Sequence, residues 1–428
     1  MGAIRGMKKV IVRGPALSHS GYGEHTRFIL RSLKSQPDLF DVYLVNINWG
    51  ATSWIWKDDS ERRWIDFLLN KTIQYTQSGG QFDMSIQVTI PQEWEKMAPI
   101  NIGATAGTET TKISPQWMAK CYEMDKIVVI SEHTKYAFEN TSYPATDKRT
   151  GQQVEAKVEC PIEVVGYPVK EIEQEKLNLD LKYDFNFLTI GTWIVRKNLD
   201  NTIKWFVEEF HDQEVGLIVK TSMAKNSIKD RIHTKNKLEN LLKDYKDRKC
   251  EVYLLHGDMK ESEMTGLYNH PNVKALVSFS HGEGYGLPLF EAAYNGLPII
   301  APNWGGQVDF LNAPVKDKKG KVSIKPLFET VAYDIKPIQP EAVWENVLIK
   351  ESMWCFPKEW NCKKSMRSVY KNYNSSKSKA SKLQNWILEN FSEQDMYQKF
   401  CDSIHKKTKE EEEWESVLND RDWETQNF

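Results

Sequence analysis

Two glutamates, Glu283 and Glu291, bracket a glycine-rich segment and are the first residues in the sequence whose types and spacing could do chemistry. Carboxylates repel phosphate but are good acceptors for the vicinal hydroxyl groups of sugars. A helix that starts behind a glycine loop offers free N–H groups and partial positive charge, which suit a diphosphate. The combination indicates a ligand with a diphosphate and a sugar at each end. The alternative is an ordinary turn that carries two solvated glutamates.

The two glutamates need a strand, a loop and a helix to position them. An apolar strand predicted at 273–279 is followed by three alternating glycines, which allow close backbone approach and positive φ. Pro288 suits the first turn of a helix, and Gly296 suits its end. Glu283 then lies in the loop and Glu291 early in the helix, so both are expected to face a ligand above the loop.

Basic residues stand at the ends of two earlier predicted strands. Arg196 and Lys197 follow a strand at 186–190, and Lys220 follows a strand at 215–219. Because the carboxyl ends of parallel strands share one edge of a sheet, these cations are expected beside the glycine loop. They could neutralise a diphosphate there without a metal ion, although solvated surface residues are the common alternative. No cysteine spacing fits zinc and no Asp-x-Asp pair stands at a strand end. No cofactor is predicted.

A second glycine-bearing loop follows the first predicted strand, at 8–13. It contains Gly21, Tyr22, Gly23 and His25 and runs to about residue 27, where an amphipathic helix is expected to begin. Loops at this end of a first strand lie where open α/β sheets bind ligands. A turn without any ligand role is the alternative.

The run Ser280-x-x-Glu283-Gly-Tyr-Gly-Leu-Pro-x-x-Glu291-Ala resembles the signature of the retaining nucleotide-sugar glycosyltransferases of family 4, which have the GT-B fold. The resemblance implies that Glu291 holds the ribose hydroxyls of the donor and that Glu283 lies beside the transferred sugar. It also implies that the loop amides meet the diphosphate and the sugar hydroxyls, from Gly284, Tyr285, Gly286 and Leu287.

The resemblance extends to the other predicted strand ends of the second half. It implies catalytic roles for Arg196 and Lys220 beside Glu283. It implies donor contacts for three further residues, of which the last lies near the base: Lys197, Gly191 and His256. The family often has an arginine directly after the first of these glycines, where this chain has Thr192.

In the first half, the segment from 108 to 131 resembles the family through an acidic residue, a Pro-x-x-Trp and an Asp-x-apolar-Ser strand. The resemblance implies that the acceptor and the transferred sugar are bordered by Gly21, Tyr22, Gly23, His25 and Glu109. The family often places a histidine before a proline near residue 89, but this chain has Thr89-Ile90-Pro91. A histidine contact from that strand is therefore not expected.

The length of 428 residues exceeds what one hydrophobic core usually serves, so two domains are predicted. The expected class is α/β: a GT-B arrangement of two Rossmann-like domains whose parallel sheets face each other across a cleft. The predicted parts are an N-terminal acceptor domain at 1–172, a C-terminal nucleotide-sugar domain at 173–385, a helix crossing back at 386–405 and a charged tail at 406–428. An irregular insertion is expected at 312–345.

The amino-acid composition excludes few classes of protein, but it indicates the cellular compartment. Apolar residues make up 40% and charged residues 27%, and the formal net charge of −2 gives no global case for nucleic-acid or membrane binding. No apolar run approaches the ~18 residues of a membrane span. The six cysteines form no paired pattern, which fits a reducing compartment. A cytoplasmic protein without a membrane span is predicted.

The function predicted from these features is retaining transfer of a hexose-type sugar from a nucleoside-diphosphate sugar to a hydroxyl of a glycan, lipid or metabolite. The resemblance implies that no metal is needed and that the leaving phosphate takes the acceptor's proton. One alternative is the same chemistry on a hydroxylated base of DNA, which the basic segments at 316–325 and 358–382 favour and the net charge opposes. The other is a non-catalytic protein that binds nucleotide sugars.

Overall fold

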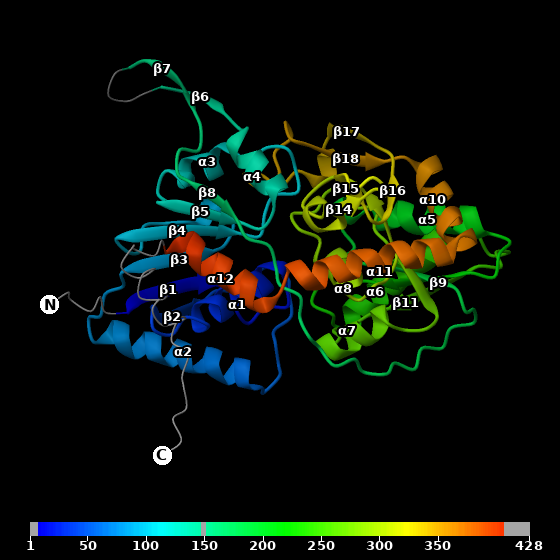
Figure 1. The fold of residues 1–428 in the computed structure, drawn as a ribbon, viewed down its shortest axis with the longest axis horizontal. Helices are drawn as coiled ribbons and strands as arrows, with labels where there is room; N and C mark the ends of the chain where they lie inside the picture. Colours follow the sequence, from blue (N-terminus) through cyan, green and yellow to red (C-terminus); the bar gives the residue numbers. More distant parts are fainter. Residues whose placement is uncertain (1–6, 147–150, 406–428) are drawn as a thin grey trace.

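The structure, a computed structural model, describes residues 7–146 and 151–405 (Figure 1). It contains two six-stranded sheets, with strand orders β2-β1-β3-β4-β5-β8 and β11-β10-β9-β12-β13-β16. Every pairing within both sheets is parallel. The predicted α/β class with two parallel sheets is confirmed. We call the described residues of 7–164 the N-terminal lobe and residues 186–390 the C-terminal lobe.

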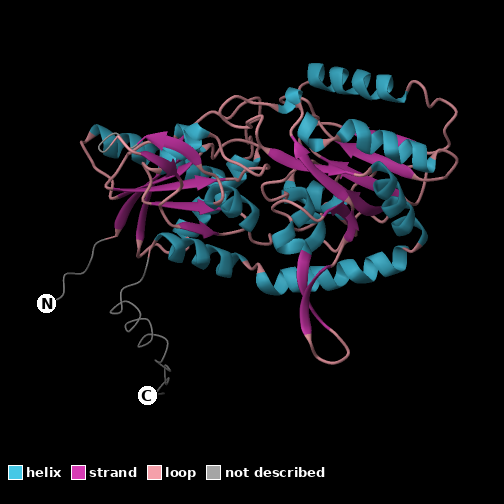
Figure 2. Cartoon of the chain, turned by 90° about the horizontal axis from the view of Figure 1, so that it is seen from above, coloured by secondary structure: helices cyan, strands magenta, loops and turns pink. Residues whose placement is uncertain are grey.

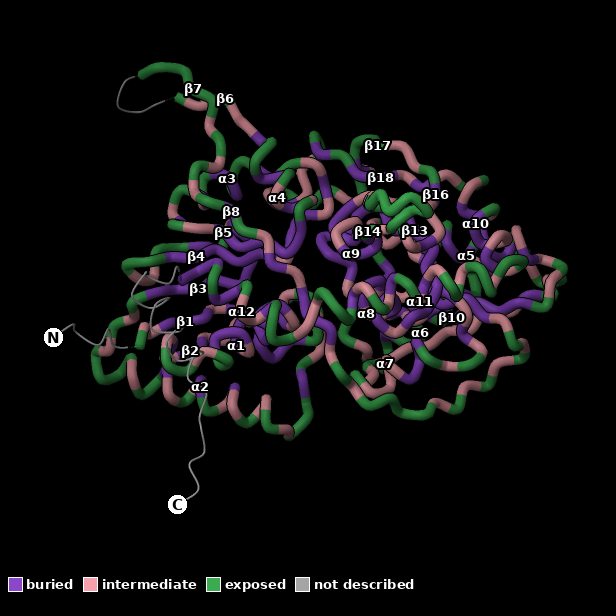
Figure 3. The backbone as a smooth tube through the Cα atoms, in the orientation of Figure 1, coloured by how far each residue is buried: buried purple, intermediate pink, exposed green. Residues whose placement is uncertain are grey.

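The strands of both sheets are apolar runs because helices and loops cover both of their faces. Residues of these strands, such as Val10, Leu188 and Val277, are fully buried, and Figure 3 shows the two sheets as the buried interior of each lobe. The first sheet consists of β1 (Lys8–Gly14), β2 (Phe40–Asn46), β3 (Met84–Val88), β4 (Ile100–Thr105), β5 (Lys126–Val129) and β8 (Ile162–Val164). The second consists of β9 (Asn186–Ile190), β10 (Gly216–Lys220), β11 (Glu251–Leu255), β12 (Val273–Val277), β13 (Ile299–Pro302) and β16 (Glu329–Val331).

Helices connect these strands in the crossover manner of parallel sheets. The N-terminal lobe has α1 (Gly21–Lys34), α2 (Ser60–Gln77), α3 (Pro115–Cys121) and α4 (Glu132–Glu139). The C-terminal lobe has α5 (Leu199–Phe210), α6 (Ile228–Leu242), α7 (Glu261–Tyr268), α8 (Leu287–Tyr294), α9 (Val308–Leu311), α10 (Glu359–Lys371) and α11 (Tyr373–Asn390). Within the described ranges, no helix is both long enough and apolar enough to cross a membrane.

The start of α1 differs from the prediction. The residues Gly21 to Arg27, expected as the end of a loop, form the first turns of this helix. Ser20 is extended, with φ of −145°, and its hydroxyl accepts a hydrogen bond from the N–H of Gly23 at 3.0 Å. This N-cap starts the helix early because it satisfies a donor that would otherwise be unpaired.

The expectation of an irregular insertion at 312–345 is wrong. β14 (Asn312–Lys316) and β15 (Val322–Pro326) form an antiparallel hairpin, and β16 then adds a sixth strand to the second sheet. β17 (Tyr333–Pro337) pairs with β18 (Met353–Pro357). A further hairpin, of β6 (Tyr143–Thr146) and β7 (Gln153–Ala156), extends from the N-terminal lobe (Figure 1).

The chain returns to the N-terminal lobe at its end. The segment expected as one helix at 386–405 holds the end of α11 and all of α12 (Glu393–Ile404). α12 lies against α1, where the rings of Phe28 and Phe400 are 5.8 Å apart between centroids (Figure 1). The tail predicted at 406–428 lies outside the described residues.

Candidate functional site

The glycine loop between β12 and α8 packs directly on the N-terminal lobe. A Cβ atom at Gly282 would lie 2.1 Å from the carbonyl oxygen of Glu109, and one at Gly284 would lie 2.6 Å from that of Ala106. Ser131 Oγ donates a hydrogen bond to the Gly284 carbonyl at 2.7 Å. These glycines therefore allow the two lobes to meet backbone to backbone, which any side chain would prevent.

Glu283 lies at the centre of a buried group of ion pairs between the lobes. Lys197 Nζ is 2.6 Å from its Oε1, and Arg196 Nη1 is 3.1 Å from its Oε2. Arg196 Nη2 is also 3.3 Å from Oε1 of Glu109, which belongs to the N-terminal lobe. We call these four residues the Glu283 cluster. Two cations face two carboxylates in it, so its formal charges balance.

The ion pairs of the Glu283 cluster offset the cost of burial. Burial would raise the pKa of Glu283, but Lys197 and Arg196 hold it below its usual value. Burial would lower the pKa of Arg196, but Glu109 and Glu283 raise it. Glu283 is therefore ionised at neutral pH. Removal of one member would leave a buried charge uncompensated, which typically costs about 3–5 kcal/mol.

A short turn directly after β9 positions both cations. Arg196 and Lys197 lie on a 3-10 turn, η2 (Val195–Lys197), which ends at Asn198 with φ of 53°. The Asn198 amide donates to a backbone carbonyl of the segment after β12 at 3.0 Å, which ties the turn to the glycine loop. A Cβ atom at Gly191 would approach Lys197 Cδ to 3.2 Å. Because Gly191 has no side chain, it leaves room for the Lys197 side chain to extend to Glu283.

Glu291 has different surroundings from Glu283. The hydroxyl of Tyr268 donates to its Oε2 at 2.8 Å, and burial raises the pKa of Glu291 to about 7. Glu291 also lines a cavity of about 260 Å³ between the lobes, which we call the α1–α8 cavity. The other lining residues come from both lobes and the segment that joins them: His19, Ser20, Glu24, Arg27, Tyr167, Pro168, Lys170, Glu261, Leu287, Phe290 and Tyr294.

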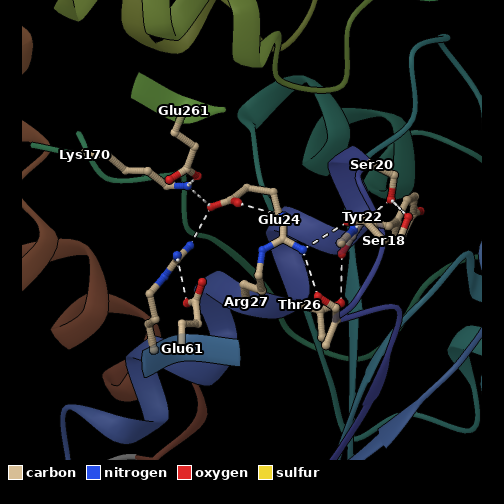
Figure 4. A network of polar contacts seen from close by, with 12 residues as sticks. Ser18, Ser20, Tyr22, Glu24, Thr26, Arg27, Glu61, Lys170 and Glu261 are labelled. Atoms are coloured by element: carbon tan, nitrogen blue, oxygen red, sulfur yellow. Dashed lines mark hydrogen bonds and ion pairs between the residues drawn. The ribbon is translucent and has the colours of Figure 1, made fainter. Parts of the chain in front are cut away.

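A network of charged side chains forms one wall of the α1–α8 cavity (Figure 4). Lys170 Nζ lies 2.7 Å from Glu24 Oε1 and 2.9 Å from Glu261 Oε1. Arg27 and Arg31 contact Glu24 from α1 itself, at 3.1 and 2.5 Å. Although burial opposes it, the charge of Lys170, and then those of the two arginines, hold the pKa of Glu24 well below its usual value.

No sequence pattern predicts this network. Glu24, Lys170 and Glu261 come from α1, from the segment between the lobes and from α7, so no local spacing connects them. Tyr268, the partner of Glu291, was missed for the same reason.

Lys220 and His256 lie at the expected strand ends, but neither belongs to the Glu283 cluster. Lys220 Nζ donates to the Gly257 carbonyl, and burial lowers the pKa of Lys220. The His256 ring contacts Asp230 of α6, with 2.8 Å between Nε2 and Oδ2. Their roles toward the diphosphate and the base stay predictions.

Tyr22 lies next to Gly21 at the exposed start of α1. Its hydroxyl shares a hydrogen bond with that of Thr105 at 2.7 Å. Its ring lies 4.2 Å from the ring of Trp49, between centroids. Because Thr105 ends β4, Tyr22 links α1 to the strand end that leads toward Glu109.

Gly23 and His25 are packed inside the protein, where they support the structure of α1. A Cβ atom at Gly23 would lie 2.0 Å from the Ser18 carbonyl oxygen, so glycine is required for α1 to close on the loop before it. The side chain of His25 is fully buried against Tyr167, and burial lowers the pKa of His25 to about 3. His25 is therefore a neutral core residue, and the acceptor contact predicted for it would require the structure to change.

Of the loop residues after Glu283, Tyr285 makes contacts within the protein, whereas Leu287 borders the cavity. Tyr285 is buried, and its hydroxyl accepts a hydrogen bond from the N–H of Tyr167 at 3.3 Å. Gly286 has φ of 95° and precedes α8 as its N-cap. Leu287 borders the α1–α8 cavity.

Comparison with known proteins identifies the fold. No protein-family model matches the chain, and no curated protein sequence matches it. The structure is similar to sucrose-phosphate synthase from Thermosynechococcus elongatus, with a TM-score of 0.59 and 10% identity over 96% of this chain and 99% of that one. It is also similar to HepE from Anabaena in complex with UDP and glucose, with a TM-score of 0.54 and 11% identity over 94% and 100%. The two likenesses show that the fold is GT-B, as predicted.

A third match covers part of a longer protein. TarM from S. aureus gives a TM-score of 0.45 at 15% identity, over 76% of this chain and 55% of TarM. The chain therefore spans about half the length of that protein.

Proposed function

We propose that the protein is a retaining glycosyltransferase that moves a hexose-type sugar from a nucleoside-diphosphate sugar to an acceptor hydroxyl. The observation that carries the proposal is the placement of the two glutamates on a GT-B fold. Glu283 is held between two cations where the lobes meet, and Glu291 lines the α1–α8 cavity. HepE, which shares the fold, was solved with UDP and glucose, and this supports the same class of donor here.

In this proposal, Glu291 accepts hydrogen bonds from the ribose hydroxyls. Glu291 is half-buried, the Tyr268 hydroxyl contacts only one of its carboxylate oxygens, and the cavity beside it is large enough for a ribose-sized group. We also propose membership of family 4, on the residues of the 280–292 run that carry the sequence resemblance. Glu283 lies farther along the loop, where its negative charge would oppose the positive charge that develops on the transferred sugar.

Arg196 and Lys197 are the proposed ligands of the diphosphate. Both cations are already paired in the Glu283 cluster, so an incoming diphosphate must compete with carboxylates for them. Glu109 is the member most easily displaced, because it belongs to the other lobe and its contact with Arg196 is the longest of the three, at 3.3 Å. Separation of the lobes would free one side of the guanidinium for phosphate, and closure would exclude water from the site.

The acceptor is proposed to be a glycan, lipid or metabolite hydroxyl. The basic segment at 358–382 gives limited support to a DNA acceptor, because part of its charge is already paired. Lys358 contacts Asp334, Lys363 contacts Glu208, and Arg367 contacts Glu209. Carboxylates thus occupy several of the cations that DNA phosphates would need.

Metal independence and a cytoplasmic location remain part of the proposal. Among the described residues, no group of three His, Cys, Asp or Glu side chains is arranged to hold a metal ion. The six cysteines are free thiols, as expected for a reducing compartment.

The decisive experiment is a panel of nucleoside-diphosphate sugars incubated with the full-length protein. We expect slow release of nucleoside diphosphate from one donor in the absence of acceptor. We also expect the α-anomer of the product from an α-linked donor when an acceptor is present. If the protein binds donors but never releases the diphosphate, it is instead a non-catalytic nucleotide-sugar-binding protein.

A further inference from the structure

The hairpin β14–β15 projects from the C-terminal lobe as a two-stranded arm. Figure 2 shows it leaving the body of the lobe beside the helices. Its base is anchored by Ala313, which is fully buried, and by a hydrogen bond from the Leu327 N–H to the Leu311 carbonyl at 3.0 Å. Beyond this base most residues of the arm are exposed, and Figure 3 colours them accordingly.

One face of the arm carries three apolar side chains beside one lysine. The register pairs Pro314 with Ile324 and Lys316 with Val322, and these four side chains lie on the same face because side chains alternate along each strand. Ile324 is 66% exposed and Val322 55%. Two β-branched side chains, two residues apart on one strand, are thus exposed side by side on the projecting face.

The arm as a whole is strongly basic. Five lysines lie on the arm, and none makes an ion pair within the described residues: Lys316, Lys318, Lys319, Lys321 and Lys325. The single carboxylate on the arm, that of Asp317, accepts backbone hydrogen bonds from Lys319 and Lys321 at 2.8 and 3.0 Å. Asp317 therefore shapes the turn, and the positive charge of the arm is left without a partner.

We propose that the β14–β15 arm docks the protein on the surface of an anionic lipid bilayer. Lysines attract anionic head groups, while Ile324 and Val322 enter the boundary between head groups and acyl chains. Single-stranded nucleic acid fits less well, because its recognition relies on aromatic stacking and on arginine, and residues 312–326 contain neither. The arm leads directly from α9, whose Asp309 accepts a hydrogen bond from the Glu132 N–H of the other lobe at 2.8 Å. A docked arm would thus hold the cleft close to the membrane.

The test is co-sedimentation of the full-length protein with vesicles of phosphatidylcholine, with and without phosphatidylserine. We expect binding to the mixed vesicles only, and weaker binding at higher ionic strength. The combined change Lys318→Gln, Lys319→Gln and Lys321→Gln should lower vesicle affinity on the order of a hundredfold. Ile324→Ser should lower it roughly tenfold without changing the thermal unfolding temperature, because the side chain is exposed.

A matched variant controls for charge. Lys364→Gln, Lys371→Gln and Lys382→Gln together remove the same charge from exposed positions of α10 and α11, and should leave vesicle binding within about twofold. Equal loss in both triple variants, or no binding of the wild-type protein to either vesicle, would overturn the proposal. Binding of a single-stranded oligonucleotide that depends on the arm lysines, without vesicle binding, would overturn it in favour of nucleic acid.

Discussion

Lys197 Nζ lies 2.6 Å from Oε1 of Glu283, so a residue directly after β9 and a residue in the loop after β12 form one buried pair. Arg196 occupies the second carboxylate oxygen at 3.1 Å. A carboxylate with a cation on each oxygen stays ionised and keeps its orientation. This arrangement gives Glu283 a fixed negative charge at the boundary between the lobes, where the proposed function needs one.

The two glutamates should give opposite kinetic signatures. Glu291→Ala should weaken both the nucleoside diphosphate and the donor and raise KM more than it lowers kcat, because ribose contacts are the same in substrate and transition state. Glu283→Gln should lower kcat and leave affinity for the free diphosphate nearly unchanged. Calorimetry and turnover measured side by side would check this. Wild-type binding and turnover in both variants would show that the donor site lies elsewhere.

The stability of the free protein should depend on pH through Glu291. Its pKa in the folded protein is about 7, above the ordinary value of 4.5. The stability that it contributes is complete below about pH 4.5 and is lost as the pH rises through about 7. Glu291→Gln, which stays neutral, should therefore unfold with a free energy roughly 2–3 kcal/mol higher than wild type at about pH 8, and with a similar one at about pH 4.5. A constant difference across this range, measured by denaturant titration, would contradict the shifted pKa.

Release of Arg196 from the other lobe should favour the diphosphate. Glu109→Gln removes one of the two carboxylates of the Glu283 cluster and leaves the guanidinium more available. We expect nucleoside-diphosphate affinity to rise by roughly three- to tenfold, as for the loss of one competing ion pair. Glu123→Gln, which loosens the pair with Lys120 at 2.9 Å beside α3, is a matched control and should have no effect.

The cations at the strand ends should contribute to turnover. Lys197→Met and Lys220→Met should each lower kcat/KM by on the order of a hundredfold or more, as for the loss of one preorganised charge in a transition state. Lys371→Met, at an exposed position of α10, serves as the control. If Lys220→Met leaves the rate unchanged, Lys220 only supports the Gly257 turn through its hydrogen bond.

Activity should survive chelation. Because neutralisation of the diphosphate is attributed to Arg196, Lys197 and Lys220, EDTA should leave donor hydrolysis and transfer within about twofold of the untreated rate. The measurement compares initial rates before and after EDTA, with magnesium or manganese added back. Loss of activity that either ion restores would show that a divalent cation takes part.

The parallel sheets could be predicted because their strands are local apolar runs. β9 and β12 are buried on both faces, so each reads as a strand without knowledge of the rest of the chain. The loop with Glu283 could be found for the same reason, since it follows such a run and precedes a proline-initiated helix. Its glycines were assigned to a ligand, however, and two of them contact the backbone of the other lobe.

The features of the fold and of the site that the sequence did not predict depend on contacts between distant segments. The charged wall of the α1–α8 cavity brings together Glu24, Lys170 and Glu261, which no local pattern connects. The early start of α1 depends on whether Ser20 caps a helix or continues a loop, and both are compatible with the glycines that follow. The order of β16 in the second sheet depends on pairing with β13 and not on its three-residue sequence.

The backbone passes between the lobes twice, once after β8 and once between α11 and α12. The two passages touch, because the N–H of Val169 donates to the carbonyl of Phe391 at 2.7 Å. Two crossings of the chain that are joined to each other at one point form a candidate hinge. If the lobes separate, we therefore expect the motion to be centred on the Val169–Phe391 contact, far along the chain from both glutamates.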